Sequence, residues 1–406
     1  MSNFLPNGWS LELLGDVTQE IGDGGTPSTS KPEYFGGSIP WVVIDDITRK
    51  IFKTRQTITE LGLAKSSAKI WKPGTLILST GATIGEVGIA QVPLTTKQGI
   101  NGIVCKANLS VEYLYQFFLN SRSLLNSLAQ GSTIKEVRAP TLKKIPIQIP
   151  PRAEQQKIAA ILTAVDDVIE STKAQINKLK DLKAGMMQEL LTKGLGHTEF
   201  KDSPIGRMPK SWEFKAIEDI CKMTSGGTPD RTIAAYWNGK IPWVKTGEIN
   251  YTTIFSSEEY ITEAGLKNSS TKLIPAGSVL MAMYGQGITR GKVAILGIDA
   301  CLNQACLAML PSSQIDKYFL FYFFTKEYEN LRLLVQEGTQ KNLNATIVKE
   351  VLVPLPPLEE QIQIRMRLQA IDDNINLKKK RMQIATDLKK SLMQDLLTGK
   401  VRVQVD

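Results

Sequence analysis

Histidine is almost absent from this sequence, because His197 is the only one among 406 residues. Histidine-rich zinc sites and catalytic triads with a histidine base need that side chain at fixed positions, so a single histidine argues against both. The four cysteines show no Cys-x-x-Cys spacing and are interpreted as buried thiols in a reducing compartment. They are Cys105, Cys221, Cys301 and Cys306.

Long hydrophobic runs are also missing. No stretch of about 18 apolar residues occurs, so we expect no membrane span. Residues 1–14 lack the basic start and the apolar run of a signal peptide. We therefore expect a soluble, cytoplasmic chain that has no membrane partner.

Motifs that carry catalysis are largely missing as well. The sequence has no Gly-x-Gly-x-x-Gly fingerprint, and it lacks the Asn-Pro-Pro-Tyr or Asp-Pro-Pro-Tyr motif of an amino-methyltransferase. Segment 285–293 resembles a phosphate-binding loop, but its spacing is wrong by one residue and Val293 replaces the magnesium-binding serine or threonine. We interpret it as a glycine-rich hairpin that presents Arg290 and Lys292. The sequence therefore predicts no catalytic residue, no cofactor and no metal site.

Two adjacent acidic pairs, Asp45-Asp46 and Asp166-Asp167, are the remaining candidates for metal ligands. Neighbouring residues on a strand point to opposite faces of the sheet, which does not suit a shared ligand. The second pair is expected among the solvent-facing positions of a helix. We therefore expect both pairs to be solvated.

Positive charge is in excess in the composition. Lys and Arg number 49 against 40 Asp and Glu, the net charge is +9, and the pI is about 9.1. Apolar residues make up 42% of the chain, enough for ordinary cores, and 406 residues suggest two to four domains. The charge favours an anionic partner such as nucleic acid, although many basic proteins bind nothing anionic.

The sequence repeats itself once. Gly24-Gly25-Thr26-Pro27 recurs at 226–229, an offset of 202 residues (226 − 24), and segment 34–42 recurs at the same offset. Pro150-Pro151 recurs as Pro356-Pro357, an offset of 206 (356 − 150), which indicates a few inserted residues in the second half. Chance does not give this many matches in register, so we interpret the chain as an internal tandem repeat.

Each half begins with a globular part, at about 1–150 and 204–356, that is rich in glycine, proline, threonine and β-branched residues. Turn signals and β-branched runs predict strands at 39–44, 75–80, 100–104, 241–244 and 278–283. A single helical stretch is expected in each half, at 111–129 and 317–335, and should pack on the sheet. Each globule is therefore predicted to be a compact α+β domain.

A long helix is predicted after each Pro-Pro pair. Apolar side chains recur there at steps of mostly four and three residues, which is the seam of a coiled coil. These side chains are Ile158, Leu162, Val165, Ile169, Thr172, Ile176, Leu179, Met186 and Leu190 in the first copy, and Ile364, Leu368, Ile371, Ile375, Met382, Ala385, Leu392 and Leu396 in the second. Lys183, Lys378 and Lys389 interrupt the pattern, which indicates either a drifting seam or a register-setting polar layer.

Each long helix is expected to run for about 40 residues, or ~60 Å, and to end at Gly194 or Gly399. We expect the two helices to pair with each other, antiparallel rather than parallel, because the end of the first lies near the start of the second. This pairing implies approximate two-fold symmetry and a rod that spans about 18 base pairs. A bundle with a different partner is the alternative.

These features together resemble the specificity subunit of a type I restriction–modification system, over essentially the whole chain. The resemblance rests on the Pro-Pro-x-x-Glu-Gln helix start at 150–155 and 356–361. It also rests on the Gly-Gly-Thr-Pro loops and the Ile-Pro-Trp strands at 39–41 and 241–243. It implies an α+β fold in which two α/β target recognition globules are separated by two long antiparallel helices.

The resemblance also implies a domain organisation. The first target recognition domain would span 1–150, the first spacer helix 151–194, and the linker with the second recognition domain 195–356. The second spacer helix would span 357–400, with a tail at 401–406.

The resemblance further implies a function and partners. Each globule would read one half of a split double-stranded DNA target, which should be asymmetric because the loops of the globules differ. The helices would fix the gap between the half-sites and dock two modification (methyltransferase) subunits. Restriction subunits would join the full complex, and the specificity subunit would itself be non-catalytic.

Basic and amide side chains beside glycine-rich loops are the candidate DNA contacts, since lysine and arginine neutralise phosphates and amides pair with base edges. The candidates are Lys97, Gln98, Lys135, Arg138, Arg290, Lys292, Gln304 and Lys341. For each one, an ordinary surface side chain is an equally good interpretation. Trp41 and Trp243 are predicted to be core residues rather than base-stacking ones, and the basic run 378–381 to be a solvated helix face.

Two other classes of function compete with this one. A non-catalytic coiled-coil scaffold whose globules bind protein is the alternative, and salt-sensitive retention on DNA would separate the two. A self-sufficient methyltransferase or nuclease would bind S-adenosylmethionine, or cleave DNA with magnesium, when purified alone. The missing motifs argue against such an enzyme.

Overall fold

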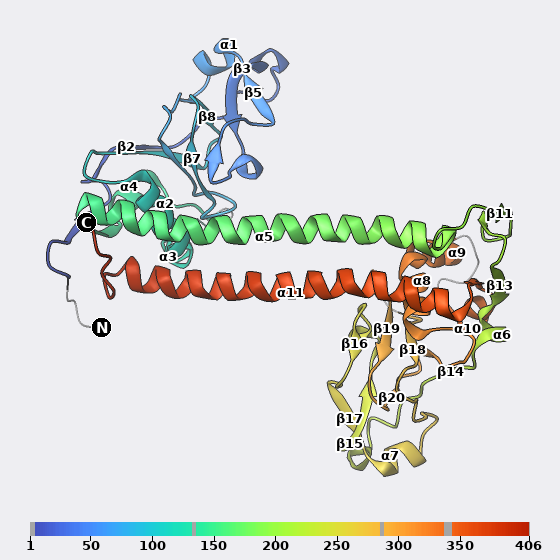
Figure 1. Ribbon diagram of the computed structural model, residues 1–406. Helices are drawn as coiled ribbons and strands as arrows, with labels where there is room; N and C mark the ends of the chain where they lie inside the picture. The colour runs from blue at the N-terminus through green and yellow to red at the C-terminus, as the bar shows by residue number, and fades with distance from the viewer. Residues whose placement is uncertain (1–4, 132–134, 285–287, 337–342, 406) are drawn as a thin grey trace. The chain divides into compact units, whose positions relative to one another are not determined.

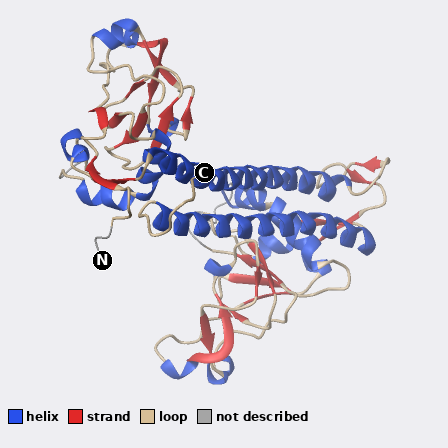
Figure 2. Ribbon diagram, turned by 60° about the vertical axis from the view of Figure 1, so that its left-hand side comes forward, coloured by secondary structure: helices blue, strands red, loops and turns tan. Residues whose placement is uncertain are grey.

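The computed structural model describes residues 5–131, 135–284, 288–336 and 343–405. The chain divides into two units, one formed by 1–173 with 380–406 and the other by 174–379. Each unit contains one domain of mixed strands and helices together with a part of each of the two long helices (Figures 1 and 2).

The domain of the first unit is built on a five-stranded sheet in the order β2-β9-β6-β7-β4 and a three-stranded sheet in the order β5-β3-β8. A separate pair joins β1 to β10. Every residue of β6 and β7 is buried, as expected for central strands that are covered on both faces. The strands are β1 Ser10–Leu13, β2 Thr18–Gly22, β3 Phe35–Val42, β4 Lys50–Ile51, β5 Gln56–Ile58, β6 Leu76–Ser79, β7 Val87–Ala90, β8 Thr95–Thr96, β9 Ile100–Cys105 and β10 Pro146–Ile149.

The domain of the second unit repeats this topology strand for strand. Its sheets have the orders β14-β21-β18-β19-β16 and β17-β15-β20, and β13 pairs with β22. The extra hairpin β11–β12 precedes them. The strands are β11 Phe200–Lys201, β12 Met208–Pro209, β13 Glu213–Ala216, β14 Met223–Ser225, β15 Trp237–Val244, β16 Thr253–Ile254, β17 Glu259–Ile261, β18 Val279–Ala282, β19 Val293–Leu296, β20 Cys301–Leu302, β21 Cys306–Met309 and β22 Leu352–Leu355. The predicted tandem repeat is therefore confirmed in three dimensions.

The helical stretch predicted after each sheet is broken into two helices. In the first domain the helix ends at Asn120, because Ser121 leaves the helical conformation with φ −99° and ψ 11°. Glu327 marks the same break in the second domain. The first domain has α1 Glu60–Ala64, α2 Val111–Asn120, α3 Arg122–Leu128 and α4 Ala139–Lys143, and the second has α6 Ile217–Ile220, α7 Glu263–Lys267, α8 Lys317–Lys326, α9 Tyr328–Gln336 and α10 Ala345–Lys349.

Both long helices form as predicted. α5 runs from Arg152 to Lys193 and α11 from Leu358 to Leu396, which are 42 and 39 residues. Gly194 and Gly399 follow them with φ values of 67° and 69°. This left-handed conformation is unfavourable for other residues, so each glycine ends its helix.

The two long helices pack against each other with opposite chain directions within each unit. In the first unit Asp166 of α5 bonds Lys389 of α11. In the second unit Gln175 and Lys183 of α5 bond Lys378 and Asp372 of α11, respectively, so a higher number on one helix meets a lower number on the other. The antiparallel prediction is confirmed within each unit.

Each domain shares one hydrophobic core with the helix segments of its unit. In the first unit Tyr113 and Phe118 of α2 are buried together with Ile158 of α5 and Leu396 of α11. In the second unit Phe319 of α8 is buried in the same cluster as Leu190 of α5 and Ile364 of α11. Each domain is therefore fixed to the helix pair by apolar packing.

None of the helices in the described ranges is long and apolar enough to cross a membrane. The four cysteines are free thiols, and Cys221, Cys301 and Cys306 are buried as predicted, whereas Cys105 is only partly buried. Burial raises the pKa of Cys221 to about 11, and burial likewise raises the pKa of Cys105 to about 12. These two side chains therefore stay protonated near neutral pH.

One acidic pair is less solvated than predicted. Asp45 is exposed, but the Asp46 side chain is only 4% exposed. Asp46 Oδ2 accepts from the backbone N–H of Val43, and its Oδ1 accepts from Arg55 Nε at 3.0 Å. The pair lies in a 3₁₀ turn, η2 Ile44–Asp46, rather than on a strand, so Asp46 folds back and caps its own turn.

Candidate DNA interface

The first domain gathers three loops at one edge of its large sheet, where β6 ends and β9 begins. The backbone N–H of Thr80, just after β6, donates to the carbonyl of Gly99, and its carbonyl accepts from the N–H of Val137, both at 2.8–2.9 Å. The Gly99 N–H in turn donates to the side chain of Asp23, just before the Gly-Gly-Thr-Pro loop. Segments far apart in the sequence therefore meet at this edge.

The four candidate residues of the first domain lie in these loops. Lys97 and Gln98 form the exposed turn before β9, and the backbone N–H of Gln98 points to the hydroxyl of Thr26. Lys135 and Arg138 are exposed on either side of Val137. The structure thus brings the predicted residues of this domain to one surface.

The second domain places three of its four candidates in the equivalent loops. Gln304 lies in the exposed turn before β21, and its side chain is hydrogen-bonded to Thr228 of the Gly-Gly-Thr-Pro loop. Arg290 and Lys292 lie in the connection between the antiparallel strands β18 and β19, as the hairpin interpretation predicted. Lys292 Nζ donates to Asn250 Oδ1 at 2.8 Å. Lys341 lies outside the described residues.

The Gly-Gly-Thr-Pro loops contain glycine because the backbone is crowded there. A Cβ atom on Gly24 would lie 2.2 Å from the carbonyl oxygen of Thr96, and one on Gly25 would lie 2.1 Å from the backbone nitrogen of Ala68. Gly226 and Gly227 face the same obstruction in the second domain. The repeated glycines therefore hold the loop against two neighbouring loops in each domain.

The two repeated tryptophans are core residues, as predicted. Trp41 and Trp243 are 3% and 2% exposed. Their indole N–H groups donate to the carbonyls of Gly25 and Gly227, at 3.0 and 2.9 Å. Each tryptophan therefore holds its glycine loop through a hydrogen bond from the core, and its ring is not available for stacking on a base.

A buried polar site joins the first domain to both long helices, and it was not predicted. Asp166 of α5 accepts a bond from Gln116 Nε2 of the domain helix α2 at 3.0 Å, and one from Lys389 Nζ of α11 at 2.5 Å. The Asp166 and Lys389 side chains are only 13% and 14% exposed. The prediction that Asp166 is solvated was therefore wrong, because the domain helix covers this face of α5.

The second unit has the same polar site at the equivalent residues. Asp372 of α11 accepts two bonds from Lys183 Nζ of α5, at 2.7 and 2.8 Å, and one from the Tyr322 hydroxyl of α8. Burial, and next the charge of Asp372, raise the pKa of Tyr322, so its hydroxyl stays a neutral donor. The interruptions at Lys183 and Lys389 are thus a polar layer, the second of the two alternatives, and Leu182 and Leu388 beside them are exposed.

The repeated Glu-Gln pair at the start of each long helix is buried, apart from the partly buried Glu360, and joins further segments. Glu154 accepts from Trp9 Nε1 and from Arg402, which follows α11, and Glu360 accepts from Trp212 Nε1 and from the backbone N–H of Leu195, which follows α5. His197 Nε2 lies 2.8 Å from Glu360.

The glutamines of these pairs tie each helix start to its domain. Gln155 accepts from the backbone N–H of Ser110, just before α2. Gln361 accepts from that of Asp316, just before α8. The Pro-Pro-x-x-Glu-Gln motif is therefore a structural joint that fixes domain, helix and tail.

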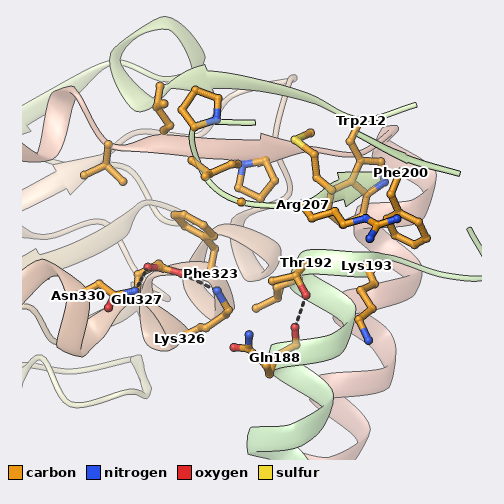
Figure 3. A pocket seen from close by; sticks show the side chains of 18 of the residues that line it. Gln188, Thr192, Lys193, Phe200, Arg207, Trp212, Phe323, Lys326, Glu327 and Asn330 are labelled. Carbon is orange, nitrogen blue, oxygen red and sulfur yellow. Dashed lines mark hydrogen bonds and ion pairs between the residues drawn. The ribbon is translucent and has the colours of Figure 1, made fainter. Parts of the chain in front are cut away.

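A cavity of about 930 Å³ lies in the second unit, at the end of α5 (Figure 3). Its wall combines Phe200 of the extra hairpin, Trp212 and Phe323 of α8. Arg207 and Lys326 add positive charge, and Lys326 is paired with Glu327 at 2.6 Å. None of the candidate DNA contacts that the structure describes lines this cavity, so it is distinct from the loop edge.

The repeat, the sheet order and the helix pair define a protein class when compared with known families. The family described as the type I restriction modification DNA specificity domain matches residues 6–181 and again residues 209–385. The chain belongs to this family, with two copies of its domain. It is a type I restriction–modification specificity subunit, the non-catalytic component through which the enzyme complex recognises its DNA target.

Curated relatives match over nearly the full length. The MjaIX specificity subunit of Methanocaldococcus jannaschii is 29% identical over 413 residues, covering 98% of this chain and 95% of the relative. The EcoKI specificity subunit of Escherichia coli is 22% identical and covers 90% and 82% of the two chains.

Solved structures share the fold. The S subunit of the type I system from M. genitalium has a TM-score of 0.62 at 14% identity, covering 98% of this chain and 97% of that one. A chain from a structure of type I R-M complex assembly has a TM-score of 0.60 at 17% identity.

Proposed function

We propose that the chain recognises a bipartite, asymmetric DNA target, one half with each domain. The observation that carries the proposal is one topology used twice with different loop chemistry at the same sheet edge. Lys97 of the first domain is replaced by Asn303 in the second, and the loop after β6 differs in length and charge. Equal scaffolds with unequal loops suit two different half-sites, because base edges are read by individual side chains.

The candidate base and phosphate contacts remain those of the loop edges. They are Lys97, Gln98, Lys135 and Arg138 in the first domain, and Arg290, Lys292, Gln304 and Lys341 in the second. Lysine and arginine supply phosphate neutralisation, and the loops supply the side chains that differ between the domains.

The long helices are proposed to set the distance between the half-sites. A continuous helix of 42 residues measures about 63 Å at 1.5 Å per residue and is stiffened by a partner of similar length. The partly buried Asp–Lys pairs oppose sliding of one helix along the other, because a shift would leave their partly desolvated charges without partners.

The helices are also proposed to dock two modification subunits, with restriction subunits completing the complex. Two identical partners need two equivalent surfaces, and the long helices provide one near the end of each. Asp181, Leu182 and Gln188 are exposed on α5, and the same residue types recur in α11 at Asp387, Leu388 and Gln394. Leu182 and Leu388 are each 51% exposed, so both copies present an apolar side chain to solvent at this place.

Exchange of one domain tests the bipartite proposal. The first domain is replaced by that of a relative with a different target, and the methylated sequences of the host DNA are read before and after. Only one half of the target should change, with the spacer unchanged. A change in both halves would contradict the modular recognition that we propose.

Leucine substitutions test the docking proposal. Leu182→Asp and Leu388→Asp should each remove one modification subunit from the assembled complex, and the double variant should remove both, as measured by native mass spectrometry. Ile384→Asp is the matched control, because Ile384 is 67% exposed on α11 but Lys178 stands at the equivalent place on α5. Loss of a subunit in the control alone would point to a different docking surface.

A further inference from the structure

The two domains share a polar patch that carries four repeated side chains, although each domain is proposed to read a different half-site. The patch contains the Gly-Gly-Thr-Pro loop, the turn before β9 or β21, and the loop after α1 or α7. Its repeated residues are Thr26, Ser67, Lys69 and Gln98 in the first domain and Thr228, Ser270, Lys272 and Gln304 in the second.

The equivalence of the two lysines follows from the strand pairing around them. Lys69 stands two residues before Trp71, which forms a bridge with Leu94, and Lys272 stands two residues before Ile274, which forms the same bridge with Ala300. Both lysines are exposed. They therefore occupy one position in the shared fold.

The local environment does not explain why this lysine is retained. In the first domain Lys69 pairs with Glu20, and its ammonium lies 5.0 Å from the ring centre of Trp71. In the second domain Lys222 stands where Glu20 does, and Ile274 where Trp71 does. The lysine is present in both domains although Glu20 and Trp71 are not, so these two contacts do not account for its recurrence.

The three loops form one continuous surface in each domain. The backbone N–H of Gln98 points to the Thr26 hydroxyl, and the side chain of Gln304 bonds that of Thr228. A Cβ on Gly25 would meet Ala68, and one on Gly227 would meet Ser270. The repeated side chains are thus held together by the crowded glycines.

Neighbouring exposed positions on the same loops have changed freely. Ser28 corresponds to Asp230, and Lys65 to Asn268. Against this background, the retention of an ammonium group, hydroxyls and an amide indicates a ligand that is identical for both domains. The sugar–phosphate backbone has this property, because its chemistry is the same whatever bases a half-site contains, and these are the side chains that bind it.

We propose that this repeated patch is a phosphodiester-binding site, present once per domain, that grips the DNA backbone in the same way at both half-sites. The inference rests on the proposed DNA recognition and divides its surface. Gln98 and Gln304 contact the backbone instead of reading adenine, and base readout belongs to the loops that differ. Each domain thus positions its half-site with repeated residues and specifies it with divergent ones.

The test uses the complex assembled with its modification subunits and two duplexes, one with the target found by methylome sequencing and one with that target scrambled. Binding is measured by fluorescence anisotropy from 50 to 200 mM salt. Lys69→Ala and Lys272→Ala should each lower the slope of log affinity against log salt by about 1, and weaken both duplexes by the same factor. The methylated sequence should stay unchanged, and Lys69→Arg should restore the slope.

Lys65→Ala is the matched control, because Lys65 is exposed four residues away and is not repeated. An unchanged slope in the Lys69 and Lys272 variants, or an equal change in the control, would overturn the proposal. So would a shift in the methylated bases, which marks base readout, or the loss of a modification subunit, which marks a protein contact. A wild-type complex that does not prefer its own target would instead refute the proposed function.

Discussion

The two units join their domain to the long helices through an aspartate at the same place, but with different side chains from the domain. In the first unit the buried aspartate, Asp166, is held by an amide from Gln116 and an ammonium from Lys389. In the second unit Asp372 is held by a phenol from Tyr322 and by two bonds from Lys183. The pair between the long helices is retained, whereas the donor from the domain has changed.

This difference separates two requirements. The Asp–Lys pair joins one long helix to the other, and a change of either partner would leave a partly buried charge unpaired. The domain donor needs only to reach the same carboxylate with a neutral N–H or O–H. A domain can therefore diverge in sequence while its attachment to the helix pair is preserved.

The joints at the helix starts differ in a similar way. Glu154 receives two bonds from the guanidinium of Arg402, at 2.6 and 2.8 Å. Glu360 receives a backbone N–H from Leu195 at 2.9 Å and lies 2.8 Å from the ring of His197. The only histidine of the chain thus has a structural position, and the segment after each helix is held by different chemistry.

The largest expected effect comes from the tryptophans that the two domains share. Trp41→Ala and Trp243→Ala should each cost about 3–5 kcal/mol, because each deletes a buried ring and its bond to the glycine loop. Hydrogen exchange should rise in the domain that carries the change and stay the same in the other. Equal destabilisation of both domains would show that the two units do not unfold independently.

The next largest effect should come from the two aspartates, Asp166 and Asp372, that join the long helices to each other and to their domains. Asp166→Asn and Asp372→Asn each leave a lysine without a charged partner, which should cost about 2–3 kcal/mol. Exchange protection should fall by about 30- to 150-fold in α2 for the first variant and in α8 for the second.

A paired replacement sharpens this comparison. Leucine at both Asp372 and Lys183 should recover part of the stability that Asp372→Asn loses, because no partly buried charge then remains unpaired. If the polar layer sets the register of the long helices, the double leucine variant should methylate targets with a wider range of spacer lengths. Methylation at a single spacer length in that variant would contradict a register-setting role for the Asp–Lys pair.

The two joints should respond unequally to loss of their side-chain partners. Arg402→Ala removes both charged bonds to Glu154, whereas His197→Ala leaves Glu360 with Trp212 and the Leu195 N–H. Limited proteolysis should therefore cleave the tail after α11 faster in the arginine variant, with little change after α5 in the histidine variant. The reverse order would refute the view that the arginine is the stronger tie.

The smallest effect is expected at Lys378, which bonds Gln175 at an exposed position between the same helices. Lys378→Ala should change stability by less than about 0.5 kcal/mol, because exposed polar pairs contribute little. Thermal unfolding measurements should compare this variant with Lys183→Ala, because both lysines interrupt the apolar seam in the sequence. A similar loss in both would mean that burial does not distinguish them.

Much of the fold was predictable because local sequence patterns determine where its long helices begin and end. The 3.6-residue periodicity, the Pro-Pro starts and the glycine stops gave α5 and α11 within a few residues of their observed ends. The internal repeat gave the equivalence of the domains. The breaks at Ser121 and Glu327 were not predicted, because neither place has the proline or glycine that marks a helix end in a sequence.

The candidate site was partly predictable for the same reason. Glycine-rich loops and basic residues pointed to Lys97, Gln98, Arg290 and Lys292, and the structure gathers those of each domain at one sheet edge. Lys69 and Lys272 were missed, although both are repeated in the sequence. A search for exposed residues that both halves retain would have found them.

What the sequence determined by itself is the set of elements and their duplication, because helix periodicity, turn chemistry and repetition are properties of neighbouring residues. What only the tertiary structure decided is which distant groups share a carboxylate. Asp166 and Lys389 are 223 residues apart, and the adjacent Asp166 and Asp167 look alike in the sequence. Their difference arises because α2 and α11 cover one face of α5. Asp166 lies on the covered face and joins the two long helices, whereas Asp167 remains largely exposed to water.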